Sequence, residues 1–298
     1  MFYLIGGASC GIMICFAALQ KIRKTVLTEG QGKRSMGTTR KTTRRTPRRK
    51  IATTQTLKRK ILGTGRTAIR RRRTAVIKRT LQLLAGVVVG LIFLSIAIVL
   101  PWRWFALPTS TFMLREHLLS DSPIHYRWVP WDRISPHLAI AVVAAEDQKF
   151  PVHHGFDFES IAQALDEKKS RRRGASTISQ QVAKNLFLWP GRSYVRKGLE
   201  AYFTILIETL WPKRRILEIY LNVAEFGPET FGVGAASRRY FTKSPEKLSL
   251  WDASLLAAVL PSPKKMSAER PSDYVRGRAS EIRTLVRQLG GAGYLADI

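Results

Sequence analysis

Two adjacent carboxylates open a segment whose residue types could carry acid–base chemistry. The segment AEDQKFPVHHGFD places Glu146 and Asp147 at the end of an apolar helical pattern, and Phe150, His153 and a glycine turn follow. Like charges side by side, or partial removal from water, raise the pKa of a carboxyl and make it a useful base near neutral pH. Such a pair alone is more often a solvated helix end, so its surroundings decide its role.

A second segment, GASTISQQVAKNLF, predicts a helix with one polar face. Thr177 and Gln180 fit a capping box, which would start the helix there. Thr177, Gln181 and Lys184 follow at i, i+4 and i+7, so a hydroxyl, an amide and an ammonium share a face near the positive helix N-terminus. That face suits a phosphate-bearing substrate, and the opposite, apolar face is most simply core.

A third segment, VRKGLEAYFTILIE, places Arg196 and Glu200 one helical turn apart, with Lys197 beside them. Taken alone, this spacing is typical of a surface ion pair worth about 0.2 to 0.5 kcal/mol. Together with the two preceding segments it indicates a site that combines carboxylates with several cations.

The elements that must position these groups are predicted to be helices. Beyond Pro108 the apolar residues recur with a 3.6-residue period, and no run of alternating strands is visible. Further helices are predicted over residues 213–225 and 248–260, and the latter, nearly all apolar, is stopped by two prolines. The sequence therefore predicts a mainly α domain with a buried helix near its C-terminal part.

A membrane anchor is predicted upstream of that domain. Leu83–Leu100 holds eighteen residues without a charge, which as a helix span about 27 Å, close to the thickness of a bilayer core. Its upstream flank is basic, and Trp102 and Trp104 follow its other end. The positive-inside rule then leaves the C-terminal domain outside the cytoplasm. We predict an anchor over residues 81–105 and a globular domain over residues 106–298.

The N-terminal part gives two further predictions. Residues 1–20 are apolar without a preceding basic stretch, so they are either a first spanning helix, giving two passes, or the product of an upstream start; we favour a start at Met36. Residues 21–80 hold 22 Lys and Arg and one acid, Glu29, with almost no aromatics, which predicts a disordered cytoplasmic tail.

Charge and cysteine content narrow the function classes. The formal net charge is +29, but most of the excess lies in residues 21–80. That tail suits anionic membrane lipids better than nucleic acid, because aromatic side chains are missing from it, and no specific nucleic-acid partner is expected. The two cysteines, Cys10 and Cys15, lie in the first apolar stretch and offer neither a disulfide framework nor a cysteine zinc site.

The three segments, in this order and followed by KRRILEIYLN and FGVGAASRRYF, closely resemble the signature of the peptidoglycan glycosyltransferases of family 51. The resemblance covers roughly residues 101–298, and with no second catalytic domain after Ile298 the chain resembles the monofunctional type. Asp252 stands where that family usually carries Glu, and Ser262 stands where Asn is common, which puts only local capping in doubt.

The resemblance implies a lysozyme-like, two-lobed fold and the polymerisation of lipid II into β-1,4 glycan strands with inversion. It makes Glu146 the general base and Glu200 the second glutamate, which holds a divalent cation, Mg²⁺ or Mn²⁺, or orients the basic groups. Lys184, Arg196 and Lys197 would neutralise the departing undecaprenyl pyrophosphate.

The resemblance also implies binding or support from further residues of the three segments, namely Asp147, Phe150, His153, Thr177, Gln181 and Asn185. The expected partners are lipid II, the growing glycan strand, membrane lipids and other cell-wall synthesis proteins. The expected location is the bacterial cytoplasmic membrane, with the catalytic domain on its outer side.

Two other function classes stay open at this point. A hydrolase that cleaves finished glycan would share the fold class and would use Glu200 as a second carboxylate. A non-enzymatic envelope protein that binds peptidoglycan would keep the fold, but would not need Glu146, Lys184, Arg196 and Glu200 together.

Overall fold

A computed structural model describes residues 54–120, 122–160, 162, 176–191 and 193–298. The chain divides into two compact units, Met1–Arg72 and Arg73–Ile298. The three segments whose residues could carry out catalysis belong to the second unit. Predictions for residues 1–53, including the first apolar stretch, lie outside the described residues.

The prediction of disorder over residues 21–80 is wrong for its last part, because helix α2 runs from Thr54 to Val99. Arg, the most frequent residue type of its basic half, and Lys are good helix formers, and a helix nucleated in the apolar half extends at little cost. Composition that cannot build a core therefore did not prevent local helix formation.

The apolar part of α2 is compatible with a membrane anchor. Thr74–Arg103, which includes the 3₁₀ turn Leu100–Arg103, is long and apolar enough to cross a membrane, and only 6% of its most apolar window is buried. A core helix of a soluble protein would be mostly covered by protein. Among the described residues it is the one helix that meets this test.

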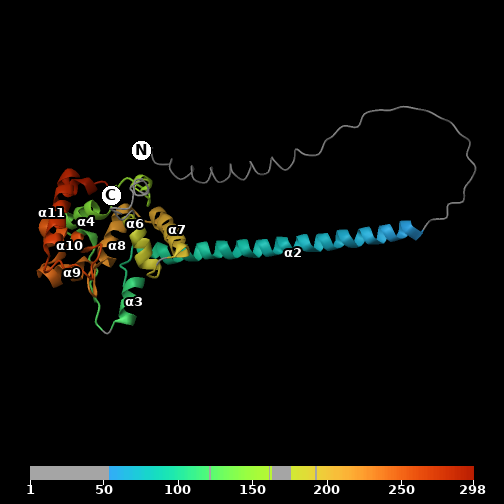
Figure 1. The fold of residues 1–298 in the computed structure, drawn as a ribbon, viewed down its shortest axis with the longest axis horizontal. Helices are drawn as coiled ribbons and strands as arrows, with labels where there is room; N and C mark the ends of the chain where they lie inside the picture. The colour runs from blue at the N-terminus through green and yellow to red at the C-terminus, as the bar shows by residue number, and fades with distance from the viewer. Residues whose placement is uncertain (1–53, 121, 161, 163–175, 192) are drawn as a thin grey trace, which may run out of the picture. The chain divides into compact units, whose positions relative to one another are not determined.

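The core of the second unit is built around two helices that are apolar on all sides. In α4 (Pro136–Glu146) every residue from Leu138 to Ala144 is buried, and in α10 (Leu250–Val259) every residue from Asp252 onward is buried. These helices pack on each other and on α11 (Asp273–Gln288), as Figure 1 shows. The predicted buried C-terminal helix is confirmed, and Asp252 completes a capping box with Ser249 at its start.

A second helical group carries the polar segments. It consists of α6 (Ile178–Phe187), α7 (Tyr194–Leu210) and α8 (Lys213–Val223), and α6 packs against both α7 and α8. Helix α3 (Thr111–Leu119) packs against α6, and its N-cap Ser110 accepts a hydrogen bond from the Met113 backbone N–H.

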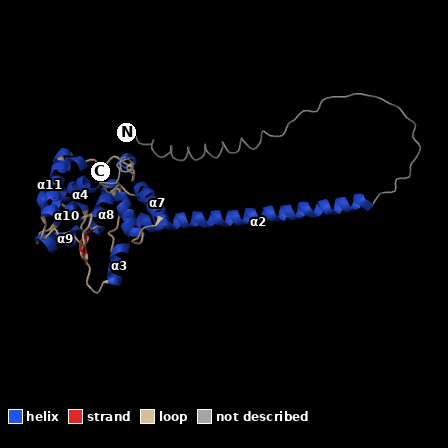
Figure 2. Cartoon of the chain, viewed as in Figure 1, coloured by secondary structure: helices blue, strands red, loops and turns tan. Residues whose placement is uncertain are grey.

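A small sheet, absent from the sequence-based prediction, joins distant parts of the chain (Figure 2). Strand β1 (His125–Tyr126) pairs in parallel with β3 (Thr230–Phe231), and β3 pairs antiparallel with β2 (Glu225–Gly227). Strands of two or three residues are too short to produce an alternating pattern. The chain between and after these elements forms α9 (Gly232–Phe241) and the 3₁₀ turns Trp131–Arg133, Pro245–Lys247 and Gly291–Leu295.

Candidate active site

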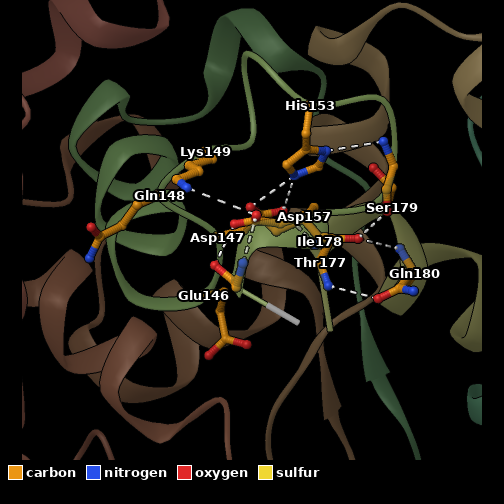
Figure 3. Close-up of polar contacts among 12 residues, drawn as sticks. Glu146, Asp147, Gln148, Lys149, His153, Asp157, Thr177, Ile178, Ser179 and Gln180 are labelled. Carbon is orange, nitrogen blue, oxygen red and sulfur yellow. Dashed lines mark hydrogen bonds and ion pairs between the residues drawn. The ribbon is translucent and has the colours of Figure 1, made fainter. Parts of the chain in front are cut away.

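The two adjacent carboxylates diverge because helix α4 ends between them. Glu146 is the last helical residue, and Asp147 is the C-cap with φ −161° and ψ 76°, outside helical geometry. The break turns the two side chains in different directions: in Figure 3 the carboxylate of Glu146 points away from the contacts that surround Asp147. Chain neighbours therefore enter different environments.

Asp147 is fully engaged inside the protein. Its carboxylate oxygens each lie 2.9 Å from Nε2 of His153, and Oδ2 also accepts the backbone N–H of Ile178 at 2.9 Å (Figure 3). Because Nδ1 of His153 accepts the backbone N–H of Gly155 at 3.0 Å, the ring donates to Asp147 from Nε2. Asp147 thus ties the loop after α4 to the positive N-terminus of α6.

Thr177 is also engaged inside the protein, so its hydroxyl does not lie on the open face that the helical spacing predicted. As N-cap of α6 it accepts the backbone N–H of Gln180 at 3.2 Å and donates to the backbone oxygen of Gly155 at 2.7 Å. The predicted capping box is confirmed, since the Gln180 side chain accepts the Thr177 N–H. We call the buried set Asp147, His153, Gly155, Thr177 and Gln180 the supporting network.

Glu146 has a single side-chain hydrogen-bond partner among the described residues. Nε2 of Gln181 donates to its Oε2 at 2.8 Å, and Oε1 of Gln181 accepts the hydroxyl of Tyr220 at 3.2 Å. Burial raises the pKa of Glu146, while the Gln181 contact and the charges of Arg278 and Lys184 oppose that rise. The carboxyl is therefore oriented by Gln181 and keeps an oxygen free to accept a proton.

Lys184 is a half-buried cation without a carboxylate partner. Among the described residues, none of the ion pairs within 4.0 Å includes it, and its Nζ lies 5.7 Å from the ring centroid of Phe112. Burial lowers its pKa and the nearby charges of Arg196 and Lys197 lower it further, although Glu200 and Glu146 act in the opposite direction. Such a group is stabilised by an incoming anion.

The predicted ion pair on α7 is confirmed, and it is buried rather than a surface pair. Glu200 is 3% exposed, and its oxygens accept from Nη1 of Arg196 at 2.8 Å and from Nζ of Lys197. The buried Nε of Arg196 has no hydrogen-bond partner. Glu200 thus orders two cations close to Lys184, which fits an anionic substrate group.

The remaining predicted residues have less direct positions. Phe150 is fully buried, and Nζ of Lys213 lies 4.6 Å from its ring centroid, so it supports the core. Asn185 is half-buried, and its backbone oxygen accepts the hydroxyl of Thr111 at 2.9 Å.

Three residues near the site were missed in the sequence. Tyr220 lies in the block KRRILEIYLN, so its place in that motif was the available signal, whereas its contact with Gln181 was not. Arg278 on α11 lowers the pKa of Glu146, and Phe112 on α3 lies beside Lys184. No local pattern marks either of them, because both reach the site only through the tertiary fold.

The sequence is similar to that of known proteins. The family model described as Transglycosylase matches residues 115–287. The chain belongs to the transglycosylase family. The match includes the carboxylates Glu146, Asp147 and Glu200 and the cations Lys184, Arg196 and Lys197. The expected mainly α, lysozyme-like fold is confirmed for this transglycosylase.

Individual relatives are similar over most of their length. A "Biosynthetic peptidoglycan transglycosylase" of Chromohalobacter salexigens is 50% identical over 226 residues, 74% of this chain and 97% of the relative. Proteins with the same description from Rhodospirillum centenum and Shewanella oneidensis are each 48% identical, covering 75% and 72% of this chain and 99% and 94% of the relatives.

Proposed function

We propose that this transglycosylase polymerises lipid II into β-1,4 glycan strands, with Glu146 as the general base. The observation that carries the proposal is the pairing of Glu146, whose pKa burial raises, with a cluster of cations that includes Lys184, which lacks a carboxylate partner. A base for a hydroxyl and a binding site for a departing anion are the two requirements of glycosyl transfer from a pyrophosphate.

In the proposed step Glu146 removes the proton of the 4-hydroxyl of the acceptor sugar. The hydroxyl oxygen forms a bond to the anomeric carbon of the donor, and the bond from that carbon to the pyrophosphate oxygen breaks with its electron pair on the pyrophosphate. Attack opposite the leaving group converts an α-linked donor into a β-linked product. Gln181 fixes the direction of the Glu146 carboxylate during this step.

The negative charge that develops on the pyrophosphate would be balanced by Lys184, Arg196 and Lys197. Glu200 accepts from Arg196 and Lys197 and so holds two of these cations in position before substrate binds. Preorganised charge of this kind contributes about 2.7 to 4 kcal/mol per donor to transition-state stabilisation.

A hydrolase is less well supported because both candidate second carboxylates are engaged. A glycosidase normally needs a second carboxylate across the scissile bond. Asp147 is bound by His153 and the backbone of Ile178, and Glu200 is bound by Arg196 and Lys197. Neither has the freedom of a nucleophile or of a base for water.

A protein-held divalent cation at Glu200 does not fit the described residues. Both Glu200 oxygens pair with cations, and the described part of the chain contains no cluster of three His, Cys, Asp or Glu that could hold a metal. Mg²⁺ or Mn²⁺ stays a prediction, for which the pyrophosphate oxygens themselves are the better ligands. No step above depends on it.

We further propose that α2 anchors the enzyme in the cytoplasmic membrane with the catalytic domain outside. The basic residues Arg70–Arg73 precede the apolar stretch, and Trp102 and Trp104 follow it, which favours this orientation. An anchored enzyme would meet a lipid-linked substrate at the outer surface of the membrane. Its basic flank would contact anionic lipid headgroups on the cytoplasmic side. Contacts with other cell-wall synthesis proteins remain a prediction.

The test is a polymerisation assay with the full chain in detergent, labelled lipid II and Mg²⁺ or Mn²⁺, with products resolved by size. We expect glycan strands from the wild type and none from Glu146→Gln. Shortening of preformed glycan with lipid II left intact would instead identify a hydrolase. If neither substrate changes while a known polymerase is active, the protein is a non-enzymatic binder.

A further inference from the structure

We infer that Phe112 is a positioning residue that holds the ammonium of Lys184 in place for the leaving group. The inference rests on the proposed role of Lys184 in the transfer reaction. Its basis is the ring of Phe112, whose centroid lies 5.7 Å from Nζ, within the range of a cation–π contact.

Helix α3 is fastened to α6 next to the residue that it would position. The hydroxyl of Thr111 donates to the backbone oxygens of Asn185 at 2.9 Å and Leu188 at 2.7 Å, at the end of α6. Met113 is 2% exposed in the core, and Ser110 caps the helix. Phe112 lies between these attachments, so its ring has a fixed place relative to the last turn of α6.

A second lysine shows what Lys184 lacks. Lys213 also lies over an aromatic ring, that of Phe150 at 4.6 Å, but it additionally donates to Glu208 at 2.8 Å. Its charge is therefore satisfied within the protein. Lys184 contacts the ring and has no carboxylate within ion-pair distance among the described residues. The ring therefore attracts the ammonium without neutralising its charge.

This arrangement has a chemical advantage for binding a pyrophosphate. A carboxylate partner would hold the ammonium equally well but would compete with the anionic leaving group and repel it. The face of an aromatic ring attracts a cation without adding a negative charge to the site. Phe112 thus orders Lys184 and leaves its full charge for the substrate.

The test compares Phe112→Leu with Phe112→Tyr, which keeps the ring, and with Leu118→Ala, an exposed position of the same helix (73% exposed). For each full-length variant, kcat/KM for lipid II is measured across pH, and the melting temperature is recorded. Lys184→Arg identifies the fall of kcat/KM at high pH, the alkaline limb, that arises from titration of Lys184, because arginine does not lose its proton in that pH range.

We expect Phe112→Leu to lower kcat/KM about three- to thirty-fold, the fold-change that corresponds to loss of a cation–π contact. Because loss of the ring disfavours the charged form, the alkaline limb should also move to lower pH, by roughly one unit. Phe112→Tyr and Leu118→Ala should retain both the rate and the limb.

Three outcomes would overturn the inference. Wild-type rate and limb in Phe112→Leu would show that the ring does nothing for Lys184. A uniform loss at all pH values with a lower melting temperature would make Phe112 a packing residue, and a loss in Phe112→Tyr equal to that in Phe112→Leu would do the same. Failure of the wild type to polymerise lipid II would instead refute the proposed function.

Discussion

Glu146 and Asp147 are neighbours in the chain, yet the charged groups around them differ in how fully they are paired. The supporting network around Asp147 gives its carboxylate three donor contacts from His153 and Ile178. The active-site groups, by which we mean Glu146, Lys184 and Arg196, each lack partners among the described residues. Glu146 has one side-chain contact, Lys184 has no carboxylate partner, and Nε of Arg196 has no hydrogen-bond partner.

The difference separates residues that hold the site from residues that act in it. Buried polar groups with all partners stabilise a fold, whereas those with missing partners cost stability. Groups of the second kind with perturbed pKa values are typical of functional sites. The comparison therefore predicts that changes in the active-site groups reduce activity without loss of stability, and that changes in the supporting network reduce stability first.

The largest effect is expected for Glu146→Gln. The amide keeps the shape but accepts no proton, so kcat/KM should fall by up to about 10⁴-fold. Since burial raises the pKa of Glu146, the folded state holds a proton that the unfolded state has lost, and stability falls as pH rises through that window. Removing the charge should leave the melting temperature at pH 7 equal or higher. A lower melting temperature would place Glu146 in the supporting network.

The same carboxyl should set the acid limb of the pH–rate profile. A general base acts in its deprotonated form, so kcat/KM should fall about tenfold per pH unit below the raised pKa of Glu146. The limb should lie above the pH at which an exposed glutamate titrates, because burial is the largest cause of the shift. A rate that stays constant down to the ordinary glutamate pKa would contradict a buried base.

Lys184→Met should produce the next largest loss, about 10² to 10³-fold in kcat/KM, because one preorganised cation is missing for the leaving group. Methionine preserves the apolar stem, and burial lowers the pKa of Lys184, so removing its charge should not lower the melting temperature. Lys184→Arg, which keeps a positive charge, serves as the control and should lose less. Equal losses in both variants would indicate that shape rather than charge matters.

Asp147→Asn should affect stability more than chemistry. In either orientation the amide nitrogen would lie against the N–H of His153, which contacts both oxygens of Asp147, so the free energy of unfolding should fall by about 2 to 3 kcal/mol. A domain of this size would lose roughly 2 to 4 °C of melting temperature per kcal/mol. Unchanged thermal unfolding, followed by circular dichroism, would remove Asp147 from the supporting network.

Local sequence patterns predicted several features of these two regions. The capping box of Thr177 and Gln180, the Arg196–Glu200 pair and the buried helix α10 each depend on residues within a turn or two of one another. The sequence also placed both carboxylates at a helix end. Spacing alone specified these features because helix geometry fixes them.

The remaining features depend on the tertiary fold, which local patterns do not specify. Which carboxylate turns away from the supporting network follows from the backbone break at Asp147, and the φ and ψ values there are not encoded by a pattern. Spacing placed the Thr177 hydroxyl on the open face, but Gly155 from a distant loop takes it inward. Phe112 and Arg278 reach the site from α3 and α11, for which the three segments give no register.

The smallest effect, and the sharpest test of the boundary between the two regions, is expected for Thr177→Ala. Loss of the N-cap hydroxyl should lower the free energy of unfolding by about 1 kcal/mol, while Thr177→Ser, which keeps the hydroxyl, should retain most of it. Because that hydroxyl is buried and bonds Gln180 and Gly155, kcat/KM of the folded Ala variant should stay within severalfold of wild type. A large rate loss at unchanged melting temperature would mean that the hydroxyl turns to the substrate during catalysis, and Thr177 would then belong with the active-site groups.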